Sequence, residues 1–239
     1  MNAKRSLRFR TRKSALVNED FRDTASALVA IGRSFYERGW ALGTSGNFSA
    51  VIGRDPLRLV ITPSGVDKGE LTAAQILEVG REGSETGGLK RKPSAEALLH
   101  IKVIERGAEA VFHTHSVWGT VLSNVHAPAG GIPIEGFEML KGLEGVKSHE
   151  HREWLPIVEN SQDMPALAES VSRTLMKYPD SHGFLLKQHG LYTWGASLAQ
   201  AKRHVEILEF LLEAVGRLHM IKPTSSSTTL DNSPFSAKE

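Results

Sequence analysis

Apolar residues recur with helical spacing in four stretches of the chain and form shorter, denser runs between them. The helical spacing predicts helices over 20–37, 95–106, 163–177 and from 197 onward. Gly39 and Gly107 end the first two, while Asp163 and Ser197 cap the last two. The denser runs predict strands over 48–52, 57–62, 110–112, 184–187 and 191–194. A further helix is expected to start near Ser116, with a short helix at 137–142, a helical turn at 72–75, and loops at 82–92 and 126–136.

This irregular alternation of helices and strands favours a mixed sheet between helical layers over a doubly wound nucleotide-binding fold. The chain has 239 residues and no internal repeat, so a single large core is expected. We divide it into a basic N-terminal segment (1–19), a folded domain (20–220) and a C-terminal tail (221–239). The tail is poor in apolar residues, which predicts disorder.

Composition excludes several classes of site and partner. The chain has no cysteine, so disulfides and thiolate ligands are excluded, and any metal must be held by histidines and carboxylates. The net charge is only +2, and part of the excess lies in the basic run 4–13. A frayed, solvated terminus explains that run better than a nucleic-acid-binding arm, and no nucleic-acid partner is expected. With no membrane-length apolar stretch and no signal-peptide pattern, we expect no membrane association and a cytoplasmic protein.

Two histidines one residue apart, His113 and His115, follow the apolar run 110–112. On a strand, side chains alternate between faces, so both imidazoles point to one side while Phe112 and Thr114 point to the other. A pair of surface histidines is the alternative for this motif taken alone. A third histidine, His189, also follows an apolar run, 183–186. Three histidines and a water molecule form an open site for a Zn²⁺-type ion.

A second histidine pair, His149 and His151, is a competing metal motif. Its imidazoles align if the segment is extended and diverge if it is helical. No apolar strand precedes it, so His189 is the preferred third ligand.

Three segments combine glycines, hydroxyls and backbone amides in a manner suited to an anion: 44–47, 62–65 and 93–94. Ser94 also precedes a predicted helix, whose positive end favours a phosphate. Lys68 and Lys92 are available as counter-charges. Each segment alone is more often an ordinary turn, but their occurrence in one half of the chain favours a shared site.

Two carboxylates, Glu96 and Glu138, are candidates for acid–base chemistry beside a divalent cation. The structural alternatives are a first-turn Glu favoured by the helix dipole for Glu96 and a solvated helix-face carboxylate for Glu138.

Five motifs, taken in order, resemble the class II aldolase/adducin-head family over about residues 20–220. They are Thr44-Ser45-Gly46-Asn47, Thr62-Pro63-Ser64-Gly65, Lys92-Pro93-Ser94-Ala95-Glu96, His113-Thr114-His115-Ser116 and His189-Gly190-Leu191-Tyr192-Thr193-Trp194-Gly195. Within that family, segments 137–142, 155–160 and 192–195 are most similar to dehydratases of a methylthio-substituted pentulose phosphate.

The resemblance implies a three-layer α/β/α sandwich around a mixed, mostly antiparallel sheet, assembled as a homotetramer. It also implies one Zn²⁺ ion per subunit, held by His113, His115 and His189, and a small sugar phosphate as substrate. The family's phosphate pocket corresponds to Gly46, Asn47, Ser64, Gly65 and Ser94.

The implied activity is zinc-dependent removal of water from the sugar phosphate, a step of methionine salvage. Glu138 matches the Glu to which the dehydratases' acid–base role is attributed, and Glu96 matches the active-site Glu of the aldolases. The alternatives are an aldolase or epimerase acting on another sugar phosphate and, less favoured, a non-enzymatic scaffold like the adducin heads.

Overall fold

Eight strands form one sheet in the order β3-β2-β1-β4-β8-β7-β6-β5. This is a computed structural model that describes residues 3–88 and 91–221. Of the neighbouring strand pairs, β6 and β7 run parallel, and the others run antiparallel. The expected mixed, mostly antiparallel sheet is therefore confirmed. The strands are β1 (Asn47–Arg54), β2 (Leu57–Ile61), β3 (Leu77–Gly80), β4 (Ala110–Thr114), β5 (Gly131–Ile134), β6 (Glu153–Val158), β7 (Gly183–Leu186) and β8 (Gly190–Gly195).

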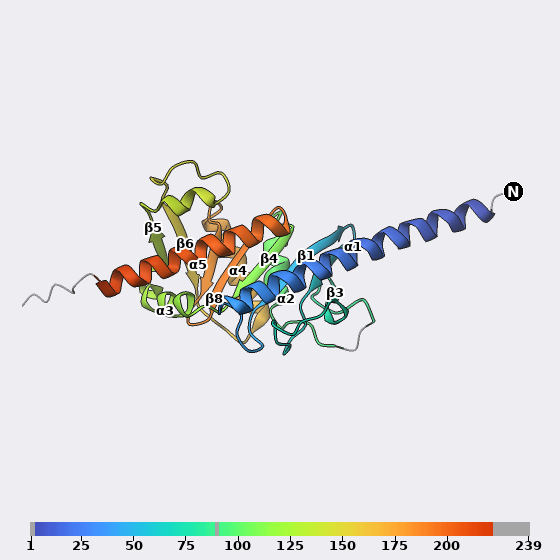
Figure 1. Cartoon of the computed structure of the whole chain (residues 1–239), viewed down its shortest axis with the longest axis horizontal. Coiled ribbons are helices and arrows are strands. Elements are labelled where there is room, and N and C mark those ends of the chain that lie inside the picture. The colour runs from blue at the N-terminus through green and yellow to red at the C-terminus, as the bar shows by residue number, and fades with distance from the viewer. Residues whose placement is uncertain (1–2, 89–90, 222–239) are drawn as a thin grey trace, which may run out of the picture.

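Helices cover both faces of the sheet, which confirms the three-layer α/β/α arrangement (Figure 1). α1 and α5 pack on one face with α3 beside α5, and α2 and α4 pack on the other. The α-helices are α1 (Ala3–Glu37), α2 (Ala97–Ile104), α3 (Val117–Val125), α4 (Met164–Lys177) and α5 (Leu198–Ile221), and the 3₁₀ turns are η1 (Ala73–Gln75), η2 (Ala127–Ala129) and η3 (Glu138–Gly142). Among the described helices, none combines the length and apolar character needed to cross a membrane.

The cores follow from alternation along the strands. On β4, Ala110 and Phe112 pack in the cluster that contains α1 and α5, whereas Val111 packs with α2 and α4. Phe35 of α1 meets Phe48 and Phe112 edge-on, with ring centroids 5.4 and 5.8 Å away. Edge-to-face packing of this kind adds to the stabilisation from burial. The face toward α2 and α4 is therefore the one that carries His113.

Three predictions of local structure need correction or limitation. α1 begins at Ala3, so the basic segment 1–19 is largely helical where a frayed terminus was expected. The loop predicted at 126–136 contains β5, whose Pro133 hid the strand pattern. Proline is tolerated there because β5 is an outermost strand, with a neighbour on one side only. Except for Ile221, the last residue of α5, the predicted disordered tail lies outside the described residues.

The strands begin and end along two opposite sides of the sheet. We call these two sides its edges, and they matter for function. β4, β6 and β7 end, and β1 and β8 begin, at one edge, which we call the histidine edge because His113 lies there. β4, β6 and β7 begin, and β5 and β8 end, at the opposite edge.

Candidate active site

His113 and His115 leave the end of β4 on the same side, as the alternation predicted. Thr114 between them points the other way and donates a hydrogen bond to Glu209 of α5. The His113 ring stacks on Tyr192 of β8, with ring centroids 3.9 Å apart. The His115 ring centroid lies 4.4 Å from that of His113. The strand geometry thus fixes two imidazoles next to each other.

His189 joins this pair because β4 and β8 are neighbours in the sheet. The residue lies in the tight turn between β7 and β8, just after Gln188, which has a positive φ of 53°. Gly190 packs so closely on the Thr114 carbonyl that no side chain fits there. As a result, His189 Nε2 lies 3.4 Å from His113 Nε2. One ring nitrogen from each of His113, His115 and His189 lies within 4.8 Å of the others.

The protonation of these rings suits a metal ion. His113 Nδ1 lies 3.0 Å from the Leu191 carbonyl oxygen. A carbonyl only accepts, so Nδ1 carries the proton and Nε2 presents its lone pair. Burial, reinforced by the neighbouring histidines, lowers the pKa of His113 well below its usual range and that of His115 to about 4. The neutral imidazoles of His113 and His115, with His189 beside them in a chain without cysteine, fit an open, three-histidine Zn²⁺ site.

The Glu96 carboxylate faces the histidines from the N-terminus of α2. Its Oε2 lies 3.6 Å from His113 Nε2, and its Oε1 lies 3.4 Å from His189 Nε2. The side chain is only 14% exposed. Tyr192 lies beside it, where burial and the Glu96 charge raise the pKa of the Tyr192 hydroxyl well above its usual range. Glu96 is therefore a partly desolvated carboxylate in the position that acid–base chemistry beside a metal requires.

A chain of buried hydrogen bonds orients Glu96. Asn47 Nδ2 donates to Glu96 Oε2 over 2.6 Å, and Asn47 Oδ1 accepts from His100 Nε2. His100 Nδ1 in turn accepts from the Ser49 hydroxyl over 2.7 Å. Burial lowers the pKa of His100 to about 3, so the ring is neutral and its single proton is directed at Asn47. Each donor in this chain points toward Glu96.

The three predicted anion segments meet at one cavity of about 260 Å³, which His115 and His189 also line. The Ser64 amide donates to the Lys92 carbonyl over 3.3 Å, which joins the second and third segments. Gly46 has a φ of +71°, and a Cβ there would lie 2.8 Å from the His113 carbonyl oxygen. The lining residues are Thr44, Ser45, Gly46, Asn47, Pro63, Ser64, Gly65, Ser94, Ala95, Glu96, His115, Asn160, Gln162, Met164 and His189.

Lys68 was a candidate counter-charge for a bound anion, but its ammonium group is used inside the protein instead. It is fully buried, and its ammonium donates to the carbonyls of Thr44 and Val66 over 3.2 and 2.8 Å. Burial lowers its pKa to about 8. Lys68 therefore holds two of the cavity loops together from behind.

The structure brings together every predicted metal and phosphate residue, together with Glu96. Asn47 differs from the expectation in one respect, because its amide is engaged by Glu96 and His100. Ser94 is also partly engaged, since its hydroxyl accepts from the Glu96 backbone amide over 3.3 Å.

Glu138 is not brought to this cavity. It lies in η3, which follows β5 at the opposite edge of the sheet. β5 is also three strands from β8, about 14 Å across the sheet. The Glu138 side chain is 68% exposed and pairs with Lys141 and with His149, whose Nδ1 is 3.6 Å from Glu138 Oε2.

Sequence reasoning missed several residues of the site. Asn160 and Gln162 reach the cavity from the connection between β6 and α4, and Met164 reaches it from the first position of α4. His100 lies one helical turn after Glu96 on a strongly apolar helix, and that spacing was a signal that the two share a face. Glu209 gave no such signal, because it contacts Thr114 across 95 residues.

Comparison with known proteins adds a family match. Residues 26–215 match the Class II Aldolase and Adducin N-terminal domain family. The chain is 42% identical over 191 residues to a methylthioribulose-1-phosphate dehydratase of Marinobacter nauticus, covering 79% of this chain and 90% of that protein. It is 41% identical over 205 residues to the same-named protein of Methylococcus capsulatus, covering 85% and 98%.

Solved structures share the fold. YgbL of Escherichia coli, described as a putative aldolase/epimerase/decarboxylase, superposes with a TM-score of 0.70 at 26% identity, covering 83% of this chain and 90% of its own. The L-fuculose-1-phosphate aldolase of Thermus thermophilus superposes with a TM-score of 0.66 at 25% identity, covering 83% and 97%.

Proposed function

Because the chain belongs to the class II aldolase and adducin N-terminal domain family, we propose that it is a metal-dependent lyase acting on 5-methylthioribulose 1-phosphate. It removes water to give 2,3-diketo-5-methylthiopentyl 1-phosphate, a step of methionine salvage. The observation that carries the proposal is the Glu96 carboxylate facing three histidines in a cavity built from small, hydroxyl-bearing loops. The relatives at 41–42% identity support the choice of substrate.

The reaction breaks the C3–H and C4–O bonds of the substrate. The C3 proton is acidic because it lies alpha to the C2 ketone, and the C4 hydroxyl leaves as water. The enol that remains moves its hydroxyl proton to C4 and becomes the second ketone. The protein must therefore take a proton from C3 and protonate the departing C4 oxygen.

His113, His115 and His189 would hold a Zn²⁺ ion, a Lewis acid that stabilises negative charge on the substrate oxygens as the C3 proton leaves. Glu96 takes that proton in this proposal. Asn47 holds Glu96 Oε2, so Oε1 is the oxygen left to receive it. The buried surroundings of Glu96 strengthen its interaction with a nearby proton donor.

The loops at the cavity bind the phosphate of the substrate in this proposal. Gly46 and Gly65 both have φ of +71°, which turns backbone amides in directions that other residues rarely allow. Ser64 and Ser94 add hydroxyl groups. These donors lie away from the reacting carbons, so they anchor the substrate.

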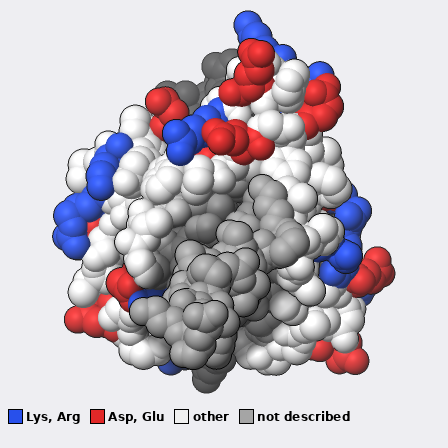
Figure 2. Space-filling view, turned by 90° about the vertical axis from the view of Figure 1, so that its left-hand side faces the viewer, with Lys and Arg blue, Asp and Glu red and all other residues white. Residues whose placement is uncertain are grey.

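Glu138 fits the reaction only if a second subunit presents it, because its own chain holds it at the opposite edge. We therefore include the expected homotetramer in the proposal, with Glu138 of a neighbouring subunit passing a proton from solvent to the departing C4 oxygen, while Glu96 returns the C3 proton to solvent after the step. Val117, Val121 and Val125 form an exposed apolar stripe on α3, which supports a subunit interface. On the left-hand side of the molecule in Figure 1, where α3 lies, much of the described surface carries no Lys, Arg, Asp or Glu (Figure 2).

Aldol cleavage of another sugar phosphate is the second candidate, favoured by Glu96 beside the histidines and by the fold shared with the fuculose-phosphate aldolase. Purified protein supplied with 5-methylthioribulose 1-phosphate and, separately, with fuculose 1-phosphate separates the two. Formation of the diketone from the first supports the dehydratase. Release of an aldehyde from the second, without diketone from the first, would replace it with an aldolase.

A further inference from the structure

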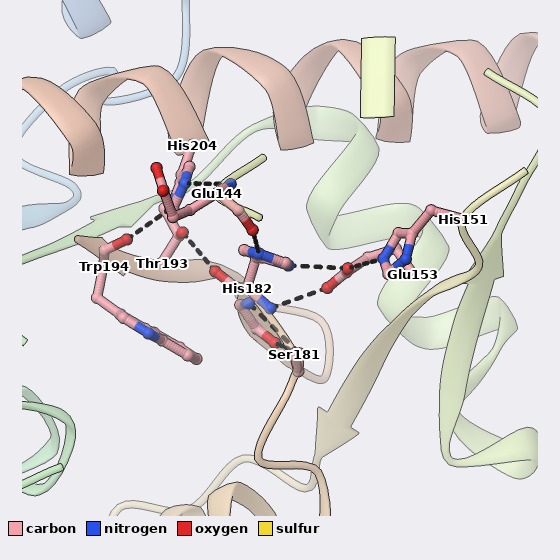
Figure 3. A network of polar contacts seen from close by, with 9 residues as sticks. Glu144, His151, Glu153, Ser181, His182, Thr193, Trp194 and His204 are labelled. Atoms are coloured by element: carbon pink, nitrogen blue, oxygen red, sulfur yellow. Dashed lines mark hydrogen bonds and ion pairs between the residues drawn. The ribbon is translucent and has the colours of Figure 1, made fainter. Parts of the chain in front are cut away.

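A second group of metal-ligating side chains lies at the opposite edge of the sheet. His151 precedes β6, Glu153 begins it, and His182 precedes β7. His151 Nε2 and His182 Nδ1 lie 3.0 and 2.9 Å from the same carboxylate oxygen, Glu153 Oε2 (Figure 3). The three ligand atoms lie within 4.8 Å of one another. They thus converge on one point from three segments of the chain.

The contacts behind these ligands have the form found around bound metal ions. His182 Nε2 donates to the Glu144 carbonyl over 2.8 Å, so Nδ1 is the nitrogen directed at Glu153. Glu153 Oε1 accepts from the His182 backbone amide over 2.8 Å, which leaves Oε2 for the shared point. Metal-ligating histidines characteristically donate their other N–H to a carbonyl, and ligating carboxylates are held by further hydrogen bonds.

Access to the group is open on one side. Glu153 is 1% exposed, whereas the imidazoles of His151 and His182 line a cavity of about 500 Å³. Two histidines, one carboxylate and a free position for water form an established ligand set for zinc.

We propose that His151, Glu153 and His182 bind a divalent transition-metal ion of the Zn²⁺ class, separate from the three-histidine site. Binding replaces the proton between His182 Nδ1 and Glu153 Oε2 with the ion, and that proton passes to solvent. Each histidine nitrogen now lies 2.9 or 3.0 Å from Glu153 Oε2, and two ligands of a tetrahedral ion lie about 3.3 Å apart. Each of these two contacts therefore has to lengthen by only a few tenths of an ångström.

A simple ion pair does not account for the whole arrangement. The His182 ring alone pairs with the charge of Glu153, and the His182 backbone amide donates a further hydrogen bond to the other carboxylate oxygen. The second imidazole, His151, approaches the same oxygen although that oxygen already has a partner. His149, two residues earlier, turns away to Glu138. Because His149 is a nearby histidine that does not face Glu153, substituting it is a matched control for substituting His151.

The test uses the full-length protein, stripped with a chelator and titrated with ZnCl₂ while bound zinc is counted. We expect two ions per chain in the wild type, one in His151→Gln and two in His149→Gln. His151 is partly exposed, so His151→Gln should fold, and circular dichroism checks this. His115→Ala should also retain one ion, at the second site.

The two sites fail in distinguishable ways. If only the second site binds, the wild type holds one ion, His115→Ala keeps it and His151→Gln loses it. That result supports the inference while removing the metal from the proposed function. The inference is overturned if the wild type holds a single ion that His151→Gln retains and His115→Ala loses, or if no zinc binds.

Discussion

Asn47 Nδ2 donates a hydrogen bond to Glu96 Oε2 over 2.6 Å, and this contact holds the carboxylate that faces the histidines. The other end of the same amide accepts from His100. Asn47 is therefore a positioning residue for the Glu96 carboxylate, with one Nδ2 hydrogen committed to Glu96 and its Oδ1 committed to His100.

Asn47→Ala is expected to lower kcat, on the order of tenfold to a hundredfold, because a misplaced acid–base group reacts poorly. His100→Gln should produce a smaller loss in the same direction. Steady-state kinetics on 5-methylthioribulose 1-phosphate provide the measurement. A change in KM alone would return Asn47 to the phosphate pocket.

Ser64→Ala should behave differently, raising KM several-fold with little change in kcat. Contacts to a phosphate remote from the reacting carbons stabilise the ground and transition states nearly alike. Ser45→Ala, in another loop of the same cavity, is a control for general disturbance of the lining. An unchanged KM in Ser64→Ala would remove that hydroxyl from substrate binding.

His115→Ala should lose zinc from the three-histidine site and activity together while keeping its fold. Two remaining protein ligands hold Zn²⁺ poorly, and His115 is not fully buried. Metal analysis, circular dichroism and turnover are measured on the same preparation. Normal turnover with the full zinc content of the wild type would contradict the assignment of the ligands.

Glu96→Gln and Glu138→Gln should each reduce kcat on the order of a hundredfold or more if both transfer protons. The subunit arrangement makes a further prediction. Because Glu138 lies at the opposite edge from its own histidines, mixed oligomers of Glu138→Gln and His115→Ala subunits should regain activity. Each mixture supplies some sites with intact ligands and an intact neighbouring Glu138. Mixtures as inactive as the parents would argue against a site shared between subunits.

Glu209 provides a prediction about pH and stability in the metal-stripped protein. It is buried on α5, and burial raises its pKa to about 7 from an ordinary value of 4.5. A carboxyl group whose pKa is raised by folding adds to the free energy of unfolding. This contribution is fully present below pH 4.5 and is lost as the pH rises through about 7. Glu209→Gln removes the titration, so relative to wild type it should gain on the order of 2–3 kcal/mol of stability between pH 5 and pH 8. Urea unfolding at both pH values measures this, and an equal difference at both would refute it.

Much of the local architecture could be predicted from the sequence because it depends on neighbouring residues. Alternation along β4 placed His113 and His115 on one side, and Asp163 does cap α4 by accepting from the Ala166 amide over 3.0 Å. The three-layer fold was predicted from ordered motifs, which report the whole domain. The strand alternation and the helix cap are encoded within a few residues of where they occur, whereas the fold was predicted from a family resemblance over the whole domain.

What could not be predicted depends on chain direction and on contacts distant in sequence. Glu138 could be assigned to the site from its motif, but only the course of β5 shows that it leaves toward the other edge. His182 and Glu153 are 29 residues apart, with no local pattern linking them. The engagement of the Asn47 amide by Glu96 likewise spans 49 residues.

The pairing of β4 with β8 has a consequence for the order of events in folding. His113 and His189 are 76 residues apart, and only the closure of this strand pair brings them together. Before closure, a nascent chain offers an ion at this site at most His113 and His115. Metal capture at this site thus follows assembly of the middle of the sheet. An ion bound there would lengthen the lifetime of the folded state by slowing unfolding, and it would contribute little to the speed at which that state forms.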